Sequence, residues 1–158
     1  MPSSQTKLKT AKRLATLRQL WGWEGKKVVF TNGVFDILHA GHVRLLERAR
    51  SLGDVLIVGV NSDASARRLG KGPGRPVNRL RDRAALLAAL SCVDAVVPFR
   101  EDTPERLLSQ LKPDVLVKGA DYGKRQIAGA RHAGRVVRVT LKAGYSTTGL
   151  IRRLQRRI

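Results

Sequence analysis

Five short runs of mostly apolar residues recur along the 158-residue chain, and they restrict its fold more than any other feature. All are rich in Val, and most lack the polar–apolar alternation of a half-exposed strand, which is typical of strands buried on both faces. The runs cover residues 27–31, 54–61, 93–99, 114–118 and 135–140. Such strands predict a parallel sheet covered by helices on each side.

The segments between these runs have helical spacing. Apolar residues recur every three or four positions in residues 8–20, and further helical patterns occupy residues 41–52, 63–69, 80–90, 103–111 and 146–158. An alternation of strands and helices with right-handed crossovers predicts a doubly wound sheet. We therefore expect a single-domain α/β fold with five parallel strands and helices on both faces. Residues 26–158 would form the domain and residues 1–25 an N-terminal helical extension.

The loop after the first strand carries the strongest functional signal, because ligands of doubly wound sheets bind beyond the carboxyl ends of the strands. It reads Thr31-Asn-Gly-Val-Phe-Asp-Ile-Leu-His-Ala-Gly-His42 and leads into a helix. Gly33 allows the backbone to approach a phosphate, and Gly41 leaves the N–H groups of the helix N-terminus open. His39 and His42 are three residues apart, so they would point to one side of the first helical turn. This pattern predicts a polyphosphate site.

Two other interpretations of the histidine pair are weaker. Structural zinc normally takes four nitrogen or sulfur ligands, and only His132, Cys92 and scattered acids remain to complete such a site. Alternatively, the histidines have no role. Their position at the ligand-binding edge of the sheet, with glycines on both sides, favours the phosphate site.

The formal net charge of +19, from 31 Lys and Arg against 12 Asp and Glu, suggests an anionic partner such as nucleic acid, a membrane surface or phosphorylated metabolites. The basic residues are spread along the chain, and the few aromatics are not interleaved with them as in single-strand binders. We therefore expect an arginine-rich solvated surface without a nucleic-acid or membrane partner. No apolar run reaches the roughly 20 residues that cross a bilayer. The single cysteine, Cys92, which we expect in the core, excludes an internal disulfide and favours the cytoplasm.

Two segments resemble the motifs of the cytidylyltransferase-like nucleotidyltransferase superfamily. His39-Ala-Gly-His42 resembles its His-x-Gly-His motif, with residues 31–36 as the preceding strand and turn, and Gly144-Tyr-Ser-Thr-Thr148 resembles its second motif. Four further segments resemble the D-glycero-β-D-manno-heptose 1-phosphate adenylyltransferase family. They are Val-Asn-Ser-Asp at 60–63, Arg-Pro-Val-Asn at 75–78, Glu-Asp-Thr-Pro at 101–104 and Val-Lys-Gly-Ala-Asp-Tyr at 117–122.

The resemblance implies that a sugar 1-phosphate attacks the α-phosphorus of ATP, which binds with Mg²⁺, and that ADP-heptose for the lipopolysaccharide core and pyrophosphate are released. His39 and His42 would contact the triphosphate, and Lys71 and Arg83 would supply mobile positive charge. The nucleotide and its phosphates would be bound by Thr31, Asn32, Gly33, Phe35, Gly41, Lys118, Gly119, Asp121, Ser146, Thr147 and Thr148. The sugar phosphate would be bound by Asp36, Asn61, Asp63 and Arg75. The resemblance identifies no metal ligand.

Several of these residues also fit simpler roles. Asp36 could brace its loop, Lys71 could be a solvated loop residue, and residues 146–148 could only cap the last helix. The functional arginine could also be Arg79 or Arg81 in place of Arg83.

The resemblance further implies a homodimer or higher homo-oligomer that works downstream of a separate sugar kinase. The segment 127–136 is shorter than the family pattern, and His132 within it has no assigned role. Two rival functions stay open: a cytidylyltransferase acting on glycerol 3-phosphate or a similar polyol phosphate, and a basic nucleic-acid-binding module with a nucleotide fold.

Overall fold

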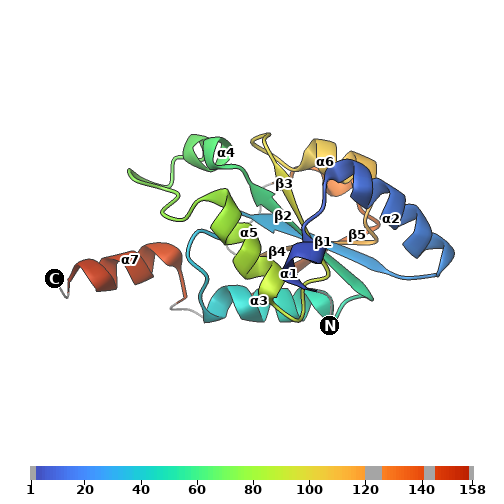
Figure 1. Cartoon of the computed structure of the whole chain (residues 1–158), viewed down its shortest axis with the longest axis horizontal. Coiled ribbons are helices and arrows are strands. Elements are labelled where there is room, and N and C mark those ends of the chain that lie inside the picture. Colours follow the sequence, from blue (N-terminus) through green and yellow to red (C-terminus); the bar gives the residue numbers. More distant parts are fainter. Residues whose placement is uncertain (1–2, 120–125, 141–144, 157–158) are drawn as a thin grey trace.

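Five parallel strands form one sheet at the centre of the molecule (Figure 1). The computed structural model describes residues 3–119, 126–140 and 145–156. The strands are β1 (Val28–Gly33), β2 (Val55–Asn61), β3 (Ala95–Phe99), β4 (Val115–Gly119) and β5 (Arg135–Val139). Their order is β3-β2-β1-β4-β5, and β1 pairs in parallel with both β2 and β4. The chain therefore winds first to one side of β1 and then to the other, which confirms the predicted doubly wound fold.

The helices cover both faces of the sheet (Figure 1). They are α1 (Ser4–Lys7), α2 (Ala11–Trp23), α3 (Ala40–Arg50), α4 (Asp63–Arg68), α5 (Leu80–Ala89), α6 (Glu105–Leu111) and α7 (Thr147–Gln155), with a 3₁₀ turn, η2, at Ala130–His132. Apolar side chains of α3 and α5, such as Leu46 and Leu87, pack with one face of the sheet. Those of α2 and α6, such as Leu14 and Leu108, pack with the other face. Every residue of β2 is buried between these two layers, which explains why its sequence is continuously apolar.

The N-terminal segment packs against the sheet. The Lys9 backbone N–H donates to the carbonyl of Val96 in β3 over 2.9 Å, and the Leu14 side chain is fully buried in the core. Arg18 forms an ion pair with Asp114, just before β4, at 3.4 Å. Residues of α2 therefore contribute to the core of the domain. The predicted boundary near residue 25 stays a prediction.

The last helix, α7, extends away from the sheet and has no buried residue (Figure 1). Its N-terminus, in contrast, reaches the region where β1 and β4 end, because Thr147 lines a cavity there. Among the described residues, no helix has the length and apolar character needed to cross a membrane.

Candidate active site

A cavity of about 150 Å³ lies where β1 and β4 end side by side, at the point where the strand order reverses. This is the place at which doubly wound sheets bind their ligands. Its walls come from β1 and the loop after it, from α3, from the glycine-rich loop 70–78, from the end of β4 and from the start of α7. The predicted site residues that line it are Thr31, Asn32, Gly33, Phe35, Asp36, His42, Lys71, Arg75, Lys118, Gly119 and Thr147.

The loop from β1 to α3 is held in a compact shape. The Thr31 hydroxyl is buried and donates to the Val117 carbonyl over 3.0 Å, which ties the end of β1 to β4. Phe35 adopts a left-handed backbone with φ of 49° and places its ring edge against His42, with ring centroids 5.3 Å apart. The backbone therefore turns sharply between strand and helix.

His39 and His42 stand side by side at the start of α3, as their spacing predicts. Their rings are stacked, with centroids 3.8 Å apart and planes inclined by 22°. His39 is the N-cap of α3, and its Nδ1 accepts the Gly41 N–H over 3.1 Å. This bond assigns the proton of the neutral His39 ring to Nε2, which can donate to a ligand.

Gly41 lets the second motif approach the first. A Cβ at this position would lie 2.7 Å from the Tyr145 Cβ and 3.0 Å from the Cε1 of His39, closer than packed atoms allow. Only glycine therefore fits between the two rings and the helix N-terminus.

Both histidines are poised as neutral groups in the free protein. Burial, together with the nearby His39 and Lys71, lowers the pKa of His42 to about 4, against the opposing effect of the Ile37 carbonyl. Burial also lowers the pKa of His39. The Nδ1 of His42 is buried and makes no hydrogen bond with a described residue. A bound anion would raise both lowered pKa values, because negative charge favours the imidazolium form. It could also supply an acceptor for the His42 ring.

Three cationic side chains border the same cavity. Lys118 is 4% exposed, its ammonium donates to Asn32 Oδ1, and burial lowers its pKa to about 8. Lys71 reaches the cavity from the glycine-rich loop, and Arg75 reaches it from the same loop while pairing with Asp36 at 2.7 Å. Positive charge around a recess at a helix N-terminus is suited to a polyphosphate. The Gly41 and His42 N–H groups, which we expected to be open, both donate to His39.

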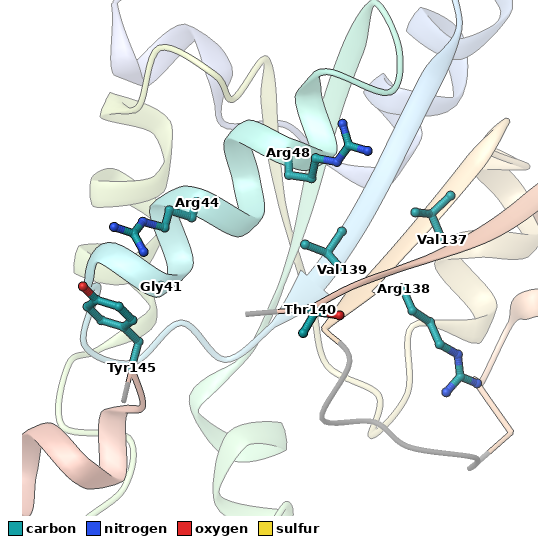
Figure 2. Close-up of a pocket in the computed structure, with 8 residues that line it drawn as sticks. All are labelled: Gly41, Arg44, Arg48, Val137, Arg138, Val139, Thr140 and Tyr145. Atoms are coloured by element: carbon teal, nitrogen blue, oxygen red, sulfur yellow. The ribbon is translucent and has the colours of Figure 1, made fainter. Parts of the chain in front are cut away.

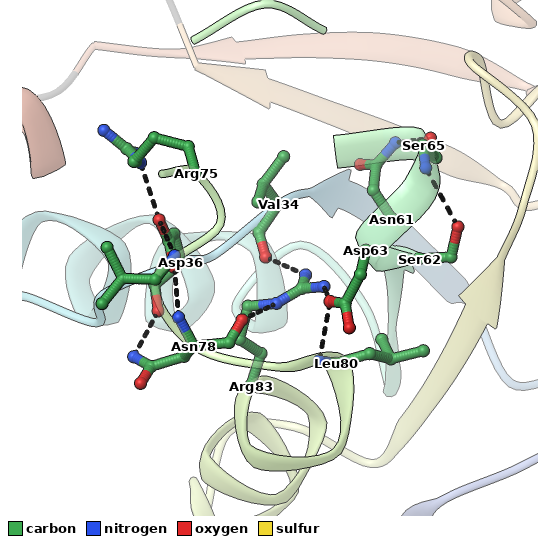
Figure 3. Close-up of polar contacts among 11 residues, drawn as sticks. Val34, Asp36, Asn61, Ser62, Asp63, Ser65, Arg75, Asn78, Leu80 and Arg83 are labelled. Atoms are coloured by element: carbon green, nitrogen blue, oxygen red, sulfur yellow. Dashed lines mark hydrogen bonds and ion pairs between the residues drawn. The ribbon is translucent and has the colours of Figure 1, made fainter. Parts of the chain in front are cut away.

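Arg83 differs from the expected mobile charge, because its side chain is fully buried. Its guanidinium donates to the Val34 carbonyl over 2.7 Å, to the Asn78 carbonyl over 3.0 Å and to Asp63 Oδ1 over 2.7 Å (Figure 3). These acceptors hold the group inside the protein, away from the cavity.

All four expected sugar-phosphate ligands are also engaged within the protein. The Asn61 amide donates to Ser65 Oγ over 2.9 Å, and the Asp63 carboxylate accepts from Leu80 N–H as well as from Arg83. Asp36 lines the cavity, but its carboxylate is occupied by donors from the glycine-rich loop. Arg75 is the member of this set with a cationic group at the cavity.

The three hydroxyl residues at the start of α7, Ser146, Thr147 and Thr148, have different surroundings. The Ser146 Oγ accepts the Gly149 N–H over 2.9 Å and caps the helix, whereas Thr147 lines the cavity and Thr148 is exposed. The expected ligand Asp121 lies outside the described residues. His132, in the η2 turn, is half-buried beside α6, with Nε2 3.7 Å from a Glu105 carboxylate oxygen.

A second recess, of about 360 Å³, adjoins the histidines between α3 and β5 (Figure 2). Its lining residues are Gly41, Arg44, Arg48, Val137, Arg138, Val139, Thr140 and Tyr145. The Arg44 guanidinium lies 5.2 Å from the centre of the Tyr145 ring, over its face. Sequence reasoning assigned no role to Arg44 or Tyr145, although Tyr145 lies within the second motif.

The described residues contain no group of three or more His, Cys, Asp or Glu side chains that could hold a metal ion. The carboxylates of Asp36 and Asp63 are occupied by arginine and backbone donors. Mg²⁺ commonly binds through substrate phosphates and keeps several waters. The chemistry of this site therefore suits an ion that enters together with a nucleoside triphosphate.

Comparisons with known proteins agree with this geometry. The cytidylyltransferase-like family profile matches residues 30–153. The chain is 58% identical over 137 residues to the bifunctional protein HldE of Azotobacter vinelandii, and 56% identical over 131 residues to that of Helicobacter pylori. These matches cover 84% and 83% of this chain but 29% and 28% of the two proteins. The chain thus spans less than a third of the length of these relatives.

Two solved structures have a fold similar to that of this chain. A lipopolysaccharide core biosynthesis protein from Thermoplasma volcanium superposes with a TM-score of 0.65 at 32% identity, over 75% of this chain and 99% of that one. Pantoate–β-alanine ligase from Francisella tularensis shares the fold, with a TM-score of 0.58 at 16% identity over 85% of this chain and 67% of that one. Because the profile match includes both histidines and most of α7, the chain belongs to the cytidylyltransferase-like family.

Proposed function

We propose that this protein is an adenylyltransferase that joins AMP from ATP to D-glycero-β-D-manno-heptose 1-phosphate and releases pyrophosphate. The observation that carries the proposal is the stacked pair His39 and His42, set at a helix N-terminus beside the ammonium group of Lys118. This set of groups is suited to a triphosphate rather than to a neutral ligand. The choice of sugar is supported by the similarity to a lipopolysaccharide core biosynthesis protein over nearly its whole length.

The proposed reaction is an in-line displacement at phosphorus. An oxygen of the sugar phosphate forms a bond to the α-phosphorus of MgATP, and the bond between that phosphorus and the bridging oxygen breaks, so that pyrophosphate leaves with the electron pair. No side chain forms a covalent bond in this scheme. Catalysis would consist of positioning and of stabilising the charge that develops on the phosphates.

The side chains have distinct tasks in this scheme. His39 Nε2 and the His42 ring would donate hydrogen bonds to phosphate oxygens, while Lys71 and Lys118 would balance their charge. Thr147 would add a hydroxyl from the start of α7. The recess between α3 and β5 would accept the base, with Arg44 and Tyr145 among the residues that line it.

The proposal also covers the source of the sugar phosphate, the oligomeric state and the compartment. A separate sugar kinase would provide the 1-phosphate, the protein would act as a homodimer or higher oligomer, and the reaction would take place in the cytoplasm, where ATP is available. Mg²⁺ would enter as part of the MgATP substrate. Light scattering after size-exclusion chromatography tests the oligomeric state.

Pyrophosphate release over a panel of substrates tests the function. The panel combines ATP, CTP, GTP and UTP with heptose 1-phosphate, glycerol 3-phosphate and glucose 1-phosphate. We expect release only with ATP and heptose 1-phosphate, and a product whose mass is that of ADP-heptose. Turnover with CTP and glycerol 3-phosphate but not with ATP would instead establish the cytidylyltransferase alternative.

A further inference from the structure

Asn78, to which no individual role was assigned, contacts both Asp36 and Arg83. Its backbone N–H donates to Asp36 Oδ1 over 2.9 Å, and its side-chain Nδ2 donates to the Asp36 carbonyl over 2.8 Å. Its own carbonyl accepts from Arg83 Nε over 3.0 Å. Asn78 is therefore fixed from two sides at the point where the glycine-rich loop meets α5 (Figure 3).

The Asp36 side of this network is built for a charged carboxylate. Asp36 is 2% exposed, and its carboxylate also accepts from the Val77 N–H over 3.0 Å and from Arg75 Nε over 2.7 Å. Burial alone would raise the pKa of Asp36, but the donors from Asn78, Val77 and Arg75 together lower it below its ordinary value. A buried carboxylate with this many donors stabilises one loop conformation, because each unmatched donor or acceptor would be costly.

The Arg83 side ties the same loop to two further segments. The guanidinium joins the carbonyl of Val34, in the loop after β1, to the carbonyl of Asn78 and to Asp63 at the start of α4. Asp63 in turn accepts the Leu80 N–H over 2.9 Å, at the first residue of α5. A fully buried arginine needs such acceptors, since an unpaired buried charge is strongly unfavourable.

The part of the loop that carries Lys71 has little support of its own. Gly70, Gly72 and Gly74 all have positive φ, and a Cβ at any of them would meet no atom within 4 Å. Lys71 nevertheless lines the catalytic cavity and lies close enough to His42 to lower the pKa of its ring. Its position therefore depends on where the following residues, 75–78, are fixed.

We propose that Asp36, Asn78 and Arg83 form a loop anchor that positions Lys71 for the chemical step. The inference rests on the proposed adenylyl transfer, and it assigns Asp36 and Arg83 to positioning rather than to substrate contact. Ordering a loop residue costs conformational free energy. An anchored loop meets this cost during folding, so that Lys71 is already in place when charge develops on the phosphates.

A double-mutant cycle between the anchor and Lys71 tests the proposal. Asp36→Asn replaces one accepting oxygen by an amide N–H₂ group, so at least one donor of the loop loses its acceptor. Lys71→Met removes the positive charge of the Lys71 side chain. We expect each single variant to lower kcat by about tenfold or more while KM for ATP changes by less than about threefold. The double variant should be no more than about twofold worse than Lys71→Met alone. If the kcat losses of the two single variants multiply in the double variant, the proposal is overturned, since the anchor would then act independently of Lys71.

Asp82→Asn is the matched control for the change in charge. The Asp82 side chain is exposed on α5 and makes no hydrogen bond or ion pair with a described residue, so the variant should retain wild-type kcat. If Asp36→Asn fails to fold, Asn78→Ala replaces it in the cycle, because it removes only the Nδ2 bond and keeps both backbone bonds. It should give a smaller loss of kcat with the same non-additivity.

Amide hydrogen exchange tests the anchor without reference to catalysis. Because the N–H groups of Val77 and Asn78 donate to the Asp36 carboxylate, Asp36→Asn should speed exchange in the peptide that contains residues 75–79, and Asp82→Asn should not. Unchanged exchange would overturn the anchor even if activity falls. Absence of pyrophosphate release from the wild-type protein would contradict the proposed function alone, and the exchange result would still decide whether the loop is anchored.

Discussion

The rings of His39 and His42 are stacked with centroids 3.8 Å apart at the N-terminus of α3. Burial disfavours the protonated form of His42, and the nearby His39 and Lys71 add to this effect, so His42 has a pKa of about 4. The free site therefore holds two neutral rings where the helix dipole already favours an anion. Binding a triphosphate would change the charge state of this pair as well as fill the cavity.

Replacing His42 by alanine should abolish most of the activity while leaving the protein folded. Its ring faces the cavity and would stabilise charge on the phosphates, so we expect kcat to fall by roughly 100-fold. His132→Ala is the matched control, because His132 lies beside Glu105 on α6 and should leave kcat unchanged. Steady-state pyrophosphate release, with circular dichroism to monitor folding, measures both. Equal losses in the two variants would contradict the assignment.

ATP binding should be accompanied by proton uptake at mildly acidic pH. The free His42 ring is neutral above about pH 4, and a bound triphosphate stabilises its protonated form, so its pKa rises on binding and the complex takes up a proton. Calorimetric titration at about pH 5.5, in two buffers that differ in ionisation enthalpy, measures this uptake. The His42→Asn variant should take up fewer protons, and identical uptake in both proteins would exclude His42 as the source.

The sheet and the histidine pair could be predicted because their signals are local. The β2 segment is apolar at nearly every position and is buried throughout, so its sequence directly reflects its environment. Likewise, residues three apart on a helix face the same side, which brings His39 and His42 together whatever the rest of the chain does.

The role of Arg83 had no local signal. Arginine is usually exposed, and the burial of this one depends on acceptors at Val34, Asp63 and Asn78 that only the tertiary fold assembles. The pairing of Asp36 with Arg75 across 39 positions of sequence is of the same kind. The sequence indicates charged groups in this region, but it does not tell which of them pair with each other and which face the cavity.

ATP affinity should weaken as the pH rises through about 8. Lys118 has a pKa of about 8 because burial disfavours its charged form, and only the ammonium form, present below that pH, attracts phosphate. The dissociation constant of ATP should therefore rise by up to tenfold per pH unit above this value. Lys118→Met should bind ATP weakly and lose this pH dependence, whereas Lys12→Met, on the exposed face of α2, should retain it. Fluorescence titration with a labelled ATP analogue from pH 6.5 to pH 9.5 distinguishes them.

Adding a single methyl group at Gly41 should impair catalysis more than stability. The new Cβ would lie 2.7 Å from the Tyr145 Cβ and 3.0 Å from the His39 ring, and both must move to relieve the contact. Because misplacement of a catalytic group by about 1 Å can cost up to 100-fold in rate, we expect Gly41→Ala to lower kcat at least tenfold.

Gly22→Ala is the control for Gly41→Ala, because Gly22 lies within α2 and its new Cβ would meet only the flexible end of Arg18, at 3.4 Å. This change should raise the free energy of unfolding by about 0.5–1 kcal/mol, since alanine favours a helix over glycine, and leave kcat unchanged. Urea unfolding and pyrophosphate release on both variants separate the two effects. Full activity in Gly41→Ala would show that the contact between the helix start and Tyr145 is not needed for catalysis.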